Sequence, residues 1–296
     1  MTSLHNRHGV IAMSVGMVCF VVNDTLVKYV SSTLPAPQLI CLRGVLSVCG
    51  LLALARLIDA SQVNRQLLQH LANRWVMLRS SLDGLASLVY LSALFHMPLA
   101  NATAINMSTP LLIALLSALW LGVRVTLGQW LIMAVGFVGV LLVVQPQAEG
   151  FNAWAWVALG GTLLHALRDL SVRWIPSHIP SVAITVGTSL SATIFAGIWG
   201  LFHEWHTVSG LEGLLLAAAA AFLSAGYYFL IKATRIADMS VIAPFRYMGL
   251  LTAVFIGFMV WGDIPNPMAW GGMGLLVGAG LMMLRLHRKP SALDAA

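Results

Sequence analysis

Ten long apolar segments run through this chain of 296 residues, and the polar stretches between them are short. The segments span residues 9–30, 37–56, 77–96, 99–121, 128–145, 153–173, 181–202, 210–232, 239–261 and 267–286. Each is close to the ~20 apolar residues that an α-helix needs to cross ~30 Å of hydrocarbon. Because lipid offers no partner for backbone polar groups, such segments must form helices. The pattern predicts an all-α integral membrane protein with ten transmembrane helices.

The composition agrees with a surface that faces lipid. Hydrophobic residues make up 59% of the chain and charged residues 9%, whereas soluble domains carry roughly 25% charged residues. Residues 10–22 resemble the apolar core of a signal peptide, but no small-residue cleavage site follows them. We therefore interpret these residues as part of the first membrane helix.

The basic residues are divided unevenly between the two ends of the segments. If the N-terminus lies in the cytoplasm, Lys28 is the single basic residue of this count on the outer side. The inner ends and loops then hold Arg7, Arg56, Arg65, Arg74, Arg79, Arg124, Arg173, Lys232, Arg235, Arg285, Arg288 and Lys289. The positive-inside rule thus predicts that both termini are cytoplasmic. These bases are spread over separate inner segments, so the net charge of +6 indicates membrane insertion and not nucleic-acid binding.

Two short patterns recur 145 residues apart, at residues 23–28 and 168–173. Each places an acid four residues before a base. At an offset of 140 residues, Gly122 matches Gly262, Trp130 matches Trp270, Asn106 matches Arg246 and Ser87 matches Tyr227. The shared offsets and the common order of these pairs indicate an internal duplication.

The duplication divides the segments into two sets of five. Residues 9–145 form the first predicted repeat, residues 153–286 the second, and residues 287–296 a cytoplasmic tail. An odd number of crossings inserts the second repeat upside down relative to the first, an architecture typical of secondary transporters. Glycines at 136 and 139, and at 274 and 278, predict close packing between the last helices of the two repeats.

The same loop element occurs in both halves, at Gly122–Trp130 and at Gly262–Trp270. Together with ten helices in two repeats, this element resembles the EamA type of the drug/metabolite transporter superfamily, over nearly the whole chain. That family often carries a Gly-Glu pair in the element, whereas this chain has Val123 and Asp263 after the two glycines. The resemblance implies a multi-pass protein of the cell inner (plasma) membrane that transports small organic solutes.

Ionisable residues far from helix ends mark the candidate path, since each costs roughly 2.5–3.5 kcal/mol at mid-bilayer. Asp24, Arg43 and Asn106 are expected ~9–10 Å below the outer boundary, at 1.5 Å per helical residue. Asp83, Asp169 and Arg246 are expected at comparable depth from the inner boundary. The counting predicts two polar layers around an apolar midsection, acting as two gates around a central site.

The gates are expected to contain ion pairs. Asp24 is predicted to pair with Arg43, and either Asp83 or Asp169 with Arg246. Lys28 and Arg168 are further candidates. For Lys28 the alternative is a side chain that extends to the lipid headgroups, and for Arg168 it is an interfacial base.

Aromatic and polar side chains suggest the wall of a substrate cavity. Asp83, Ser87 and Tyr90 lie four and three residues apart and therefore share one helix face. The other cavity candidates are Asn106, Trp120, His165, Tyr227 and Tyr247. Tyrosine combines an apolar wall with a polar tip, which suits a site for an organic solute. His165 is either a hydrogen-bonded packing residue or a proton carrier.

The sequence favours a secondary transporter over the other function classes. A membrane enzyme would require a nucleophile–base pair or a metal-ligand grouping, and neither spacing occurs, so no cofactor or metal is predicted. A channel would require a continuous polar face, and ATP-driven transport would require a P-loop. A channel-like facilitator stays as an alternative to alternating access.

The predicted substrate is a small zwitterionic metabolite, with amino acids first and aromatic amino acids among them. The buried acids and bases are nearly balanced in number. A strongly cationic solute would be expected to require an excess of acids in the site, and a phosphorylated solute an excess of bases. The favoured direction is export, and uptake of a vitamin- or nucleoside-like solute is the alternative. The expected partners are the lipid bilayer, the solute, and a proton or counter-solute. We expect a monomer.

The topology is testable by labelling single cysteines in whole cells. Cysteines at positions 149 and 208 should react with an impermeant external reagent, and cysteines at 66 and 234 should not, because the first two lie in predicted outer loops. Labelling on the wrong side at any two positions would contradict ten helices with both termini inside.

Overall fold

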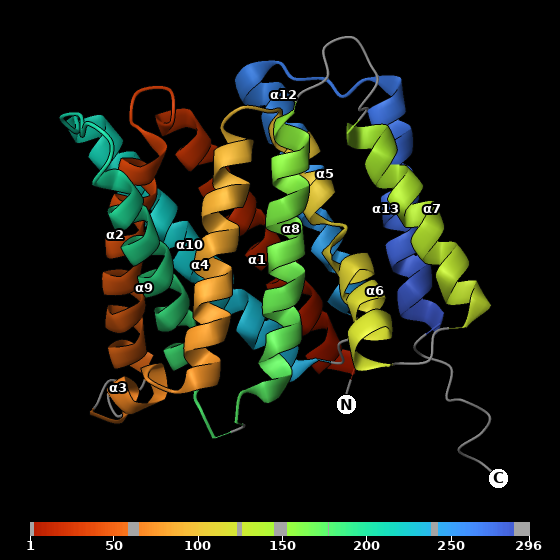
Figure 1. The fold of residues 1–296 in the computed structure, drawn as a ribbon, viewed down its shortest axis with the longest axis horizontal. Helices are drawn as coiled ribbons and strands as arrows, with labels where there is room; N and C mark the ends of the chain where they lie inside the picture. Colours follow the sequence, from red (N-terminus) through yellow and green to blue (C-terminus); the bar gives the residue numbers. More distant parts are fainter. Residues whose placement is uncertain are drawn as a thin grey trace.

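The computed structural model describes residues 3–58, 65–122, 126–144, 153–176, 178–237 and 242–286. All regular secondary structure in these ranges is helical, and the long helices run up and down one bundle (Figure 1). The first turn of α1 and the last turn of α13 lie at the same end of it (Figure 1). The predicted tail, 287–296, lies outside the described residues.

Helix occurs within every apolar range that the sequence predicts. The elements are α1 (Ser3–Val30), α2 (Ala36–Ile58), α3 (Arg65–Leu71), α4 (Arg74–Leu94), α5 (Leu99–Asn106), α6 (Thr109–Leu121), α7 (Leu127–Val144), α8 (Trp154–Ser171), η2 (Val172–Trp174), α9 (Ser181–Gly200), α10 (Gly210–Ile236), η3 (Ala243–Tyr247), α12 (Met248–Trp261) and α13 (Pro267–Leu286). Among the described residues, six helical stretches are long and apolar enough to cross a membrane by length and composition.

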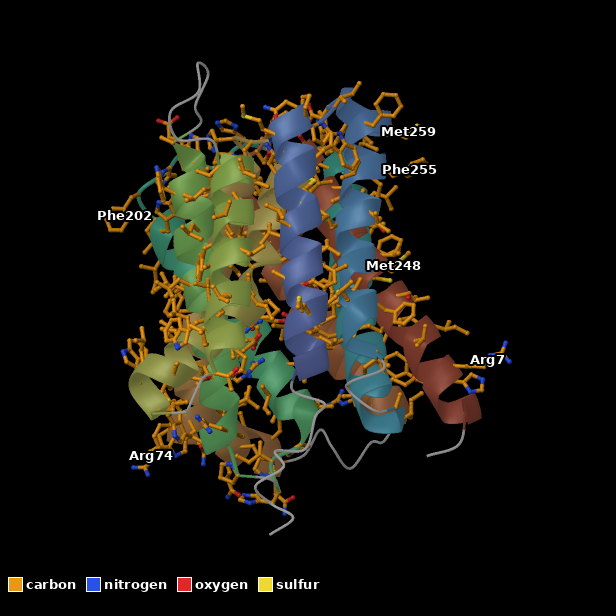
Figure 2. All side chains as sticks on the ribbon, turned by 90° about the vertical axis from the view of Figure 1, so that its right-hand side faces the viewer. Arg7, Arg74, Phe202, Met248, Phe255 and Met259 are labelled. Carbon is orange, nitrogen blue, oxygen red and sulfur yellow. The ribbon has the colours of Figure 1, made fainter. Side chains whose placement is uncertain are left out.

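The outward-facing surface of the bundle is apolar over much of its height. Phe202, Phe255 and Met259 expose 82%, 63% and 66% of their surface, and they point away from the bundle in Figure 2. Arg7 and Arg74 project at the opposite end. Further large apolar side chains are exposed on other helices, among them Leu131 of α7 and Leu214 of α10. Soluble monomers rarely expose extensive apolar surface, so the outer surface of the bundle is suited to contact with lipid.

Glycines let the helices approach one another at related positions. A Cβ atom at Gly16 of α1 would lie 3.3 Å from the backbone nitrogen of Leu230 in α10. A Cβ atom at Gly161 of α8 would lie 2.9 Å from the backbone nitrogen of Tyr90 in α4. Gly161 follows Gly16 by 145 residues, and Leu230 follows Tyr90 by 140. Contacts in both halves therefore recur at the offsets found in the sequence.

Helices α7 and α13 pack backbone to backbone, as the glycines predict, but through a different glycine of α13. A Cβ atom at Gly272 would lie 2.6 Å from the carbonyl oxygen of Gly139, whereas one at Gly274 or Gly278 would meet no atom within 4 Å. The contact face of α13 thus includes Gly272, and the predicted Gly274–Gly278 face points elsewhere.

One helical segment departs from regular α-helix at an equivalent place in each half. In the first half, two turn residues separate α5, which ends at Asn106, from α6, which begins at Thr109. In the second half, the 3-10 helix η3 ends at Tyr247 and passes directly into α12 at Met248. Both α6 and α12 end on a glycine with positive φ, 63° at Gly122 and 69° at Gly262. Glycine adopts this left-handed conformation without the steric cost of a Cβ atom, which explains why the two loop elements share it.

Replacing Gly272 with alanine should destabilise the protein, because the new methyl group would collide with the backbone of α7. Overpacking of this kind costs roughly 1–3 kcal/mol. The measurement is thermal unfolding of the purified protein in detergent. Gly274→Ala, two residues away and without a neighbour, is the matched control and should unfold like the unchanged protein. Equal stability of the two variants would contradict the α7–α13 contact.

Candidate functional site

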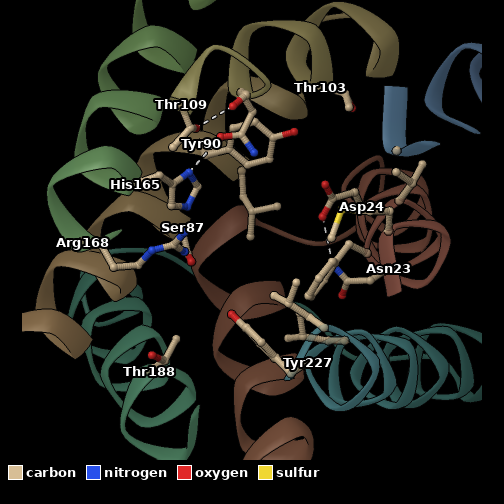
Figure 3. A pocket seen from close by; sticks show the side chains of 18 of the residues that line it. Asn23, Asp24, Ser87, Tyr90, Thr103, Thr109, His165, Arg168, Thr188 and Tyr227 are labelled. Atoms are coloured by element: carbon tan, nitrogen blue, oxygen red, sulfur yellow. Dashed lines mark hydrogen bonds between the residues drawn. The ribbon is translucent and has the colours of Figure 1, made fainter. Parts of the chain in front are cut away.

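A cavity of about 380 Å³ lies inside the bundle and is lined from both halves of the chain. Helices α1, α2, α4, α5 and α6 contribute residues from the first half, and α8, α9, α10, η3, α12 and α13 from the second. In Figure 3, His165 and Arg168 of α8 face Asp24 of α1 across a common space, with Tyr227 of α10 beside them. The cavity therefore brings together side chains far apart in the sequence.

One charged group of the cavity joins α1 to α2. Arg43 donates from Nη1 to Oδ1 of Asn23 over 3.0 Å, and Asn23 donates from Nδ2 to Oδ1 of Asp24 over 2.9 Å. Arg43 is 5% exposed, and its Nε has no hydrogen-bond partner among the described residues. The predicted Asp24–Arg43 ion pair is thus wrong in its geometry, because the amide of Asn23 stands between the two charges.

A second charged group joins α8 to α4. Arg168 donates from Nη1 to Asp83 over 2.6 Å and from Nε to Asp169 over 2.9 Å. Arg79 lies 3.9 Å from Asp83 and donates to the hydroxyl of Thr188 over 3.1 Å. Asp83 is 1% exposed, so its charge depends on these two arginines. The prediction that Asp83 or Asp169 pairs with Arg246 is wrong, because both acids contact Arg168.

Aromatic rings form part of the cavity wall. Tyr227 packs edge-on against Phe20 of α1, with ring centres 5.2 Å apart, and Tyr90 lies 5.9 Å from the ring of His165. His165 donates from Nδ1 to Oδ1 of Asn106 over 3.0 Å. The rings offer apolar surface next to charged groups, which suits a solute with both kinds of surface.

Arg246 and Tyr247 reach the cavity from η3, directly before α12. A Cβ atom at Gly280 of α13 would overlap the hydroxyl of Tyr247, so only glycine leaves room for that ring. Among the described residues, Arg246 has no acid within ion-pair distance.

The predicted cavity residues Ser87, Tyr90, Asn106, His165, Tyr227 and Tyr247 all line the cavity. Trp120 is the exception: it lies at the end of α6, 68% exposed and away from the cavity. Its aromatic ring is the reason for the prediction that it lines the cavity. Its position in the last turn of α6, two residues before Gly122, instead indicates the exposed surface of the bundle.

The predicted gate residues divide into three groups. Asp24, Arg43, Arg168, Asp169 and Arg246 line the cavity, and Asp83 lies behind Arg168. Lys28 lies elsewhere: it donates to the carbonyl of Met97 and lies 4.8 Å above the ring of Trp261. The ion pair predicted for Lys28 is absent among the described residues.

Most residues of the two predicted polar layers line one cavity, with Asp83 behind Arg168. The separation of these residues into two layers at different depths stays a prediction. Residues that sequence reasoning did not assign to the site also line the cavity: Asn23, Ser47, Thr103, Thr188 and Ser189. Their hydroxyl and amide groups are common inside membrane helices, so only Asn23, inside the repeated pattern, carried a usable signal.

No group of three or more metal-ligating side chains occurs in the part of the chain that the structure describes. The chemistry of the cavity is that of binding: arginines and aspartates for charged groups, hydroxyls and amides for hydrogen bonds, and tyrosines for apolar surface.

Comparisons with known proteins identify the family. The profile of the EamA-like transporter family matches residues 7–145 and again residues 152–285. A riboflavin transporter of Vibrio cholerae is 25% identical over 92% of this chain and 91% of the relative. The pseudopaline exporter CntI of Pseudomonas aeruginosa is 27% identical over 95% of this chain and 98% of the relative.

Two further similarities agree. An S-adenosylmethionine uptake transporter of Rickettsia felis is 23% identical over 65% of each chain. A protein of known crystal structure covers 94% of this chain and 99% of its own length with a TM-score of 0.64 at 17% identity, a likeness of fold. The three named relatives are transporters of small molecules and not enzymes. The chain is a multi-pass inner-membrane protein and belongs to the EamA-like transporter family.

Proposed function

We propose that this protein is a secondary transporter that moves a small amphoteric metabolite, an amino acid in the first instance, out of the cell by alternating access. The observation that carries the proposal is the cavity of about 380 Å³, in which aspartates, arginines and tyrosines from both halves meet. Buried ionisable groups are costly in a membrane protein and mark solute paths. Charges of both signs beside aromatic rings suit a zwitterion with an apolar side chain.

The proposed architecture has ten crossings, in two inverted repeats of five, with both termini cytoplasmic. Three findings support it: the family profile matches each half, glycine contacts recur at the sequence offsets, and departures from regular α-helix occupy equivalent positions.

Uptake of a vitamin-like solute is the second candidate, with one specific observation in its favour. A riboflavin transporter is similar over nearly the whole length of both chains. The tyrosines of the cavity would also suit a planar ring system. A neutral vitamin makes less use of the charged groups, so we place the amphoteric solute first.

Counterflow separates these possibilities from a channel. Proteoliposomes loaded with an unlabelled solute should accumulate the labelled solute transiently if a carrier exchanges the two. Aromatic amino acids and riboflavin are the probes. We expect overshoot with an amino acid; overshoot with riboflavin alone would favour the second candidate, and uptake without overshoot would favour a channel.

Replacing Tyr90 or Tyr227 with alanine should raise the solute concentration that gives half-maximal counterflow. The expected rise is up to about tenfold, because one aromatic contact contributes ~0.5–1.5 kcal/mol. Tyr228→Ala is the matched control, since Tyr228 follows Tyr227 on α10 without lining the cavity. An unchanged concentration in both cavity variants would move the binding site away from α4 and α10.

The α4–α8 ion cluster is a proposed inner gate, because Arg168 joins two helices that must separate if the cavity opens between them. Arg168→Ala should shift the population towards the inward-open state and lower stability by roughly 3–5 kcal/mol, since it leaves Asp169 unpaired and buried Asp83 with only the more distant Arg79. A cysteine at Thr188 should then react faster from the cytoplasmic side. Arg173→Ala removes an exposed base nearby and is the control; equal labelling in both backgrounds would exclude a gate at Arg168.

A further inference from the structure

The charged residues in and beside the cavity do not balance. Three acids, Asp24, Asp83 and Asp169, stand against four arginines, Arg43, Arg79, Arg168 and Arg246. With every group ionised, this set carries one excess positive charge. An excess charge in a partly buried cavity is costly to desolvate when a solute fills the cavity, and a bound solute of opposite charge would compensate it.

The contacts show which arginine lacks a compensating acid. Arg168 binds two carboxylates and Arg79 lies beside one of them. Arg43 is joined to Asp24 through a single amide. Arg246 lines the cavity, and no acid among the described residues lies within ion-pair distance of it. Arg43 also lacks a direct ion pair, but Asp24 compensates its charge through Asn23, so the excess charge of the set falls on Arg246.

The position of Arg246 is also unusual in the fold. It lies in the 3-10 helix η3, directly before α12, and its counterpart 140 residues earlier, Asn106, ends α5 before the turn to α6. Both residues line the cavity. Asn106 is already bonded to His165, so the two halves present a neutral amide and a cation at equivalent places.

We propose that Arg246 is a specificity-determining residue that binds a carboxylate of the transported solute. The planar guanidinium matches a carboxylate with two parallel hydrogen bonds. A single carboxylate neutralises the excess charge, whereas a phosphate monoester, with a charge of about −1.5 to −2, overcompensates it. The inference rests on the proposed transport function and adds to it the anionic group that the solute must carry.

The test compares matched probes on the full-length protein purified in detergent. The carboxylates are L-phenylalanine and 3-phenylpropionate, each paired with its carboxamide, and FMN paired with riboflavin serves as the phosphate arm. A ligand that binds only the folded state raises the unfolding temperature. We expect each carboxylate to raise it more than the carboxamide does, and FMN to add nothing over riboflavin.

Variants then assign the effect to one residue. In Arg246→Gln the apparent affinity for the carboxylates should fall about tenfold or more, since a charge-assisted pair is lost. Arg246→Lys should restore part of it, and Arg173→Gln, which removes an exposed base on η2, should change nothing. If carboxylates and carboxamides act equally on the unchanged protein, including no effect of either, the proposal is overturned.

Failure of the transport function and failure of the role of Arg246 give different results. If riboflavin shows counterflow while no carboxylate binds better than its carboxamide, the transport function stands and the role of Arg246 is wrong. Carboxylate binding that depends on Arg246, without counterflow of any probe, would support the binding site and oppose transport. A stronger effect of FMN than of the carboxylates would assign Arg246 to phosphate and overturn the carboxylate proposal.

Discussion

Hydrocarbon provides no hydrogen-bond partners, and this constraint governs the whole structure. The backbone must satisfy its own polar groups, so the apolar segments form helices. Ionisable side chains must also avoid lipid, and the few that occur within the segments turn towards one another inside the bundle. The cavity follows from this sorting: residues such as Asp24, Arg43 and Arg168 gather where helices leave space, while Phe255 and Met259 face outwards.

Close packing of the helices depends on small residues, because lipid is as apolar as the helix surface and adds little drive for association. Gly139 and Gly272 bring α7 against α13, and Gly16 and Gly161 seat α1 against α10 and α8 against α4. These contacts fix the depth at which charged side chains meet. Gly161, two turns before Arg168, admits the backbone of α4, and Arg168 reaches Asp83 of the same helix over 2.6 Å.

Within the cavity, direct ion pairs and shielded charges have different consequences. Arg168 is engaged by two carboxylates and is expected to hold its helices together. Arg43 reaches Asp24 only through Asn23, and Arg246 contacts no described acid. Charges that are not fully paired remain available to a solute, so the uneven pairing separates groups that support the structure from those that bind.

The sequence by itself determined the all-helical membrane class, the positions of the apolar segments and the family resemblance. Six of the seven residues that it predicts in the cavity also lie there. These features follow from hydropathy, ionisable residues and repeat offsets, which can be read along the chain. Only the tertiary structure decided which side chains pair. Depth along a helix predicts Arg246 as the partner of Asp83 or Asp169, yet depth says nothing about the rotation of a helix, and Arg168 is the base that contacts both acids. The same limit explains why Trp120 lies outside the predicted cavity and why Gly274 lies outside the predicted α7–α13 contact. Rotation and neighbour choice arise from packing between distant segments, which no stretch of sequence contains.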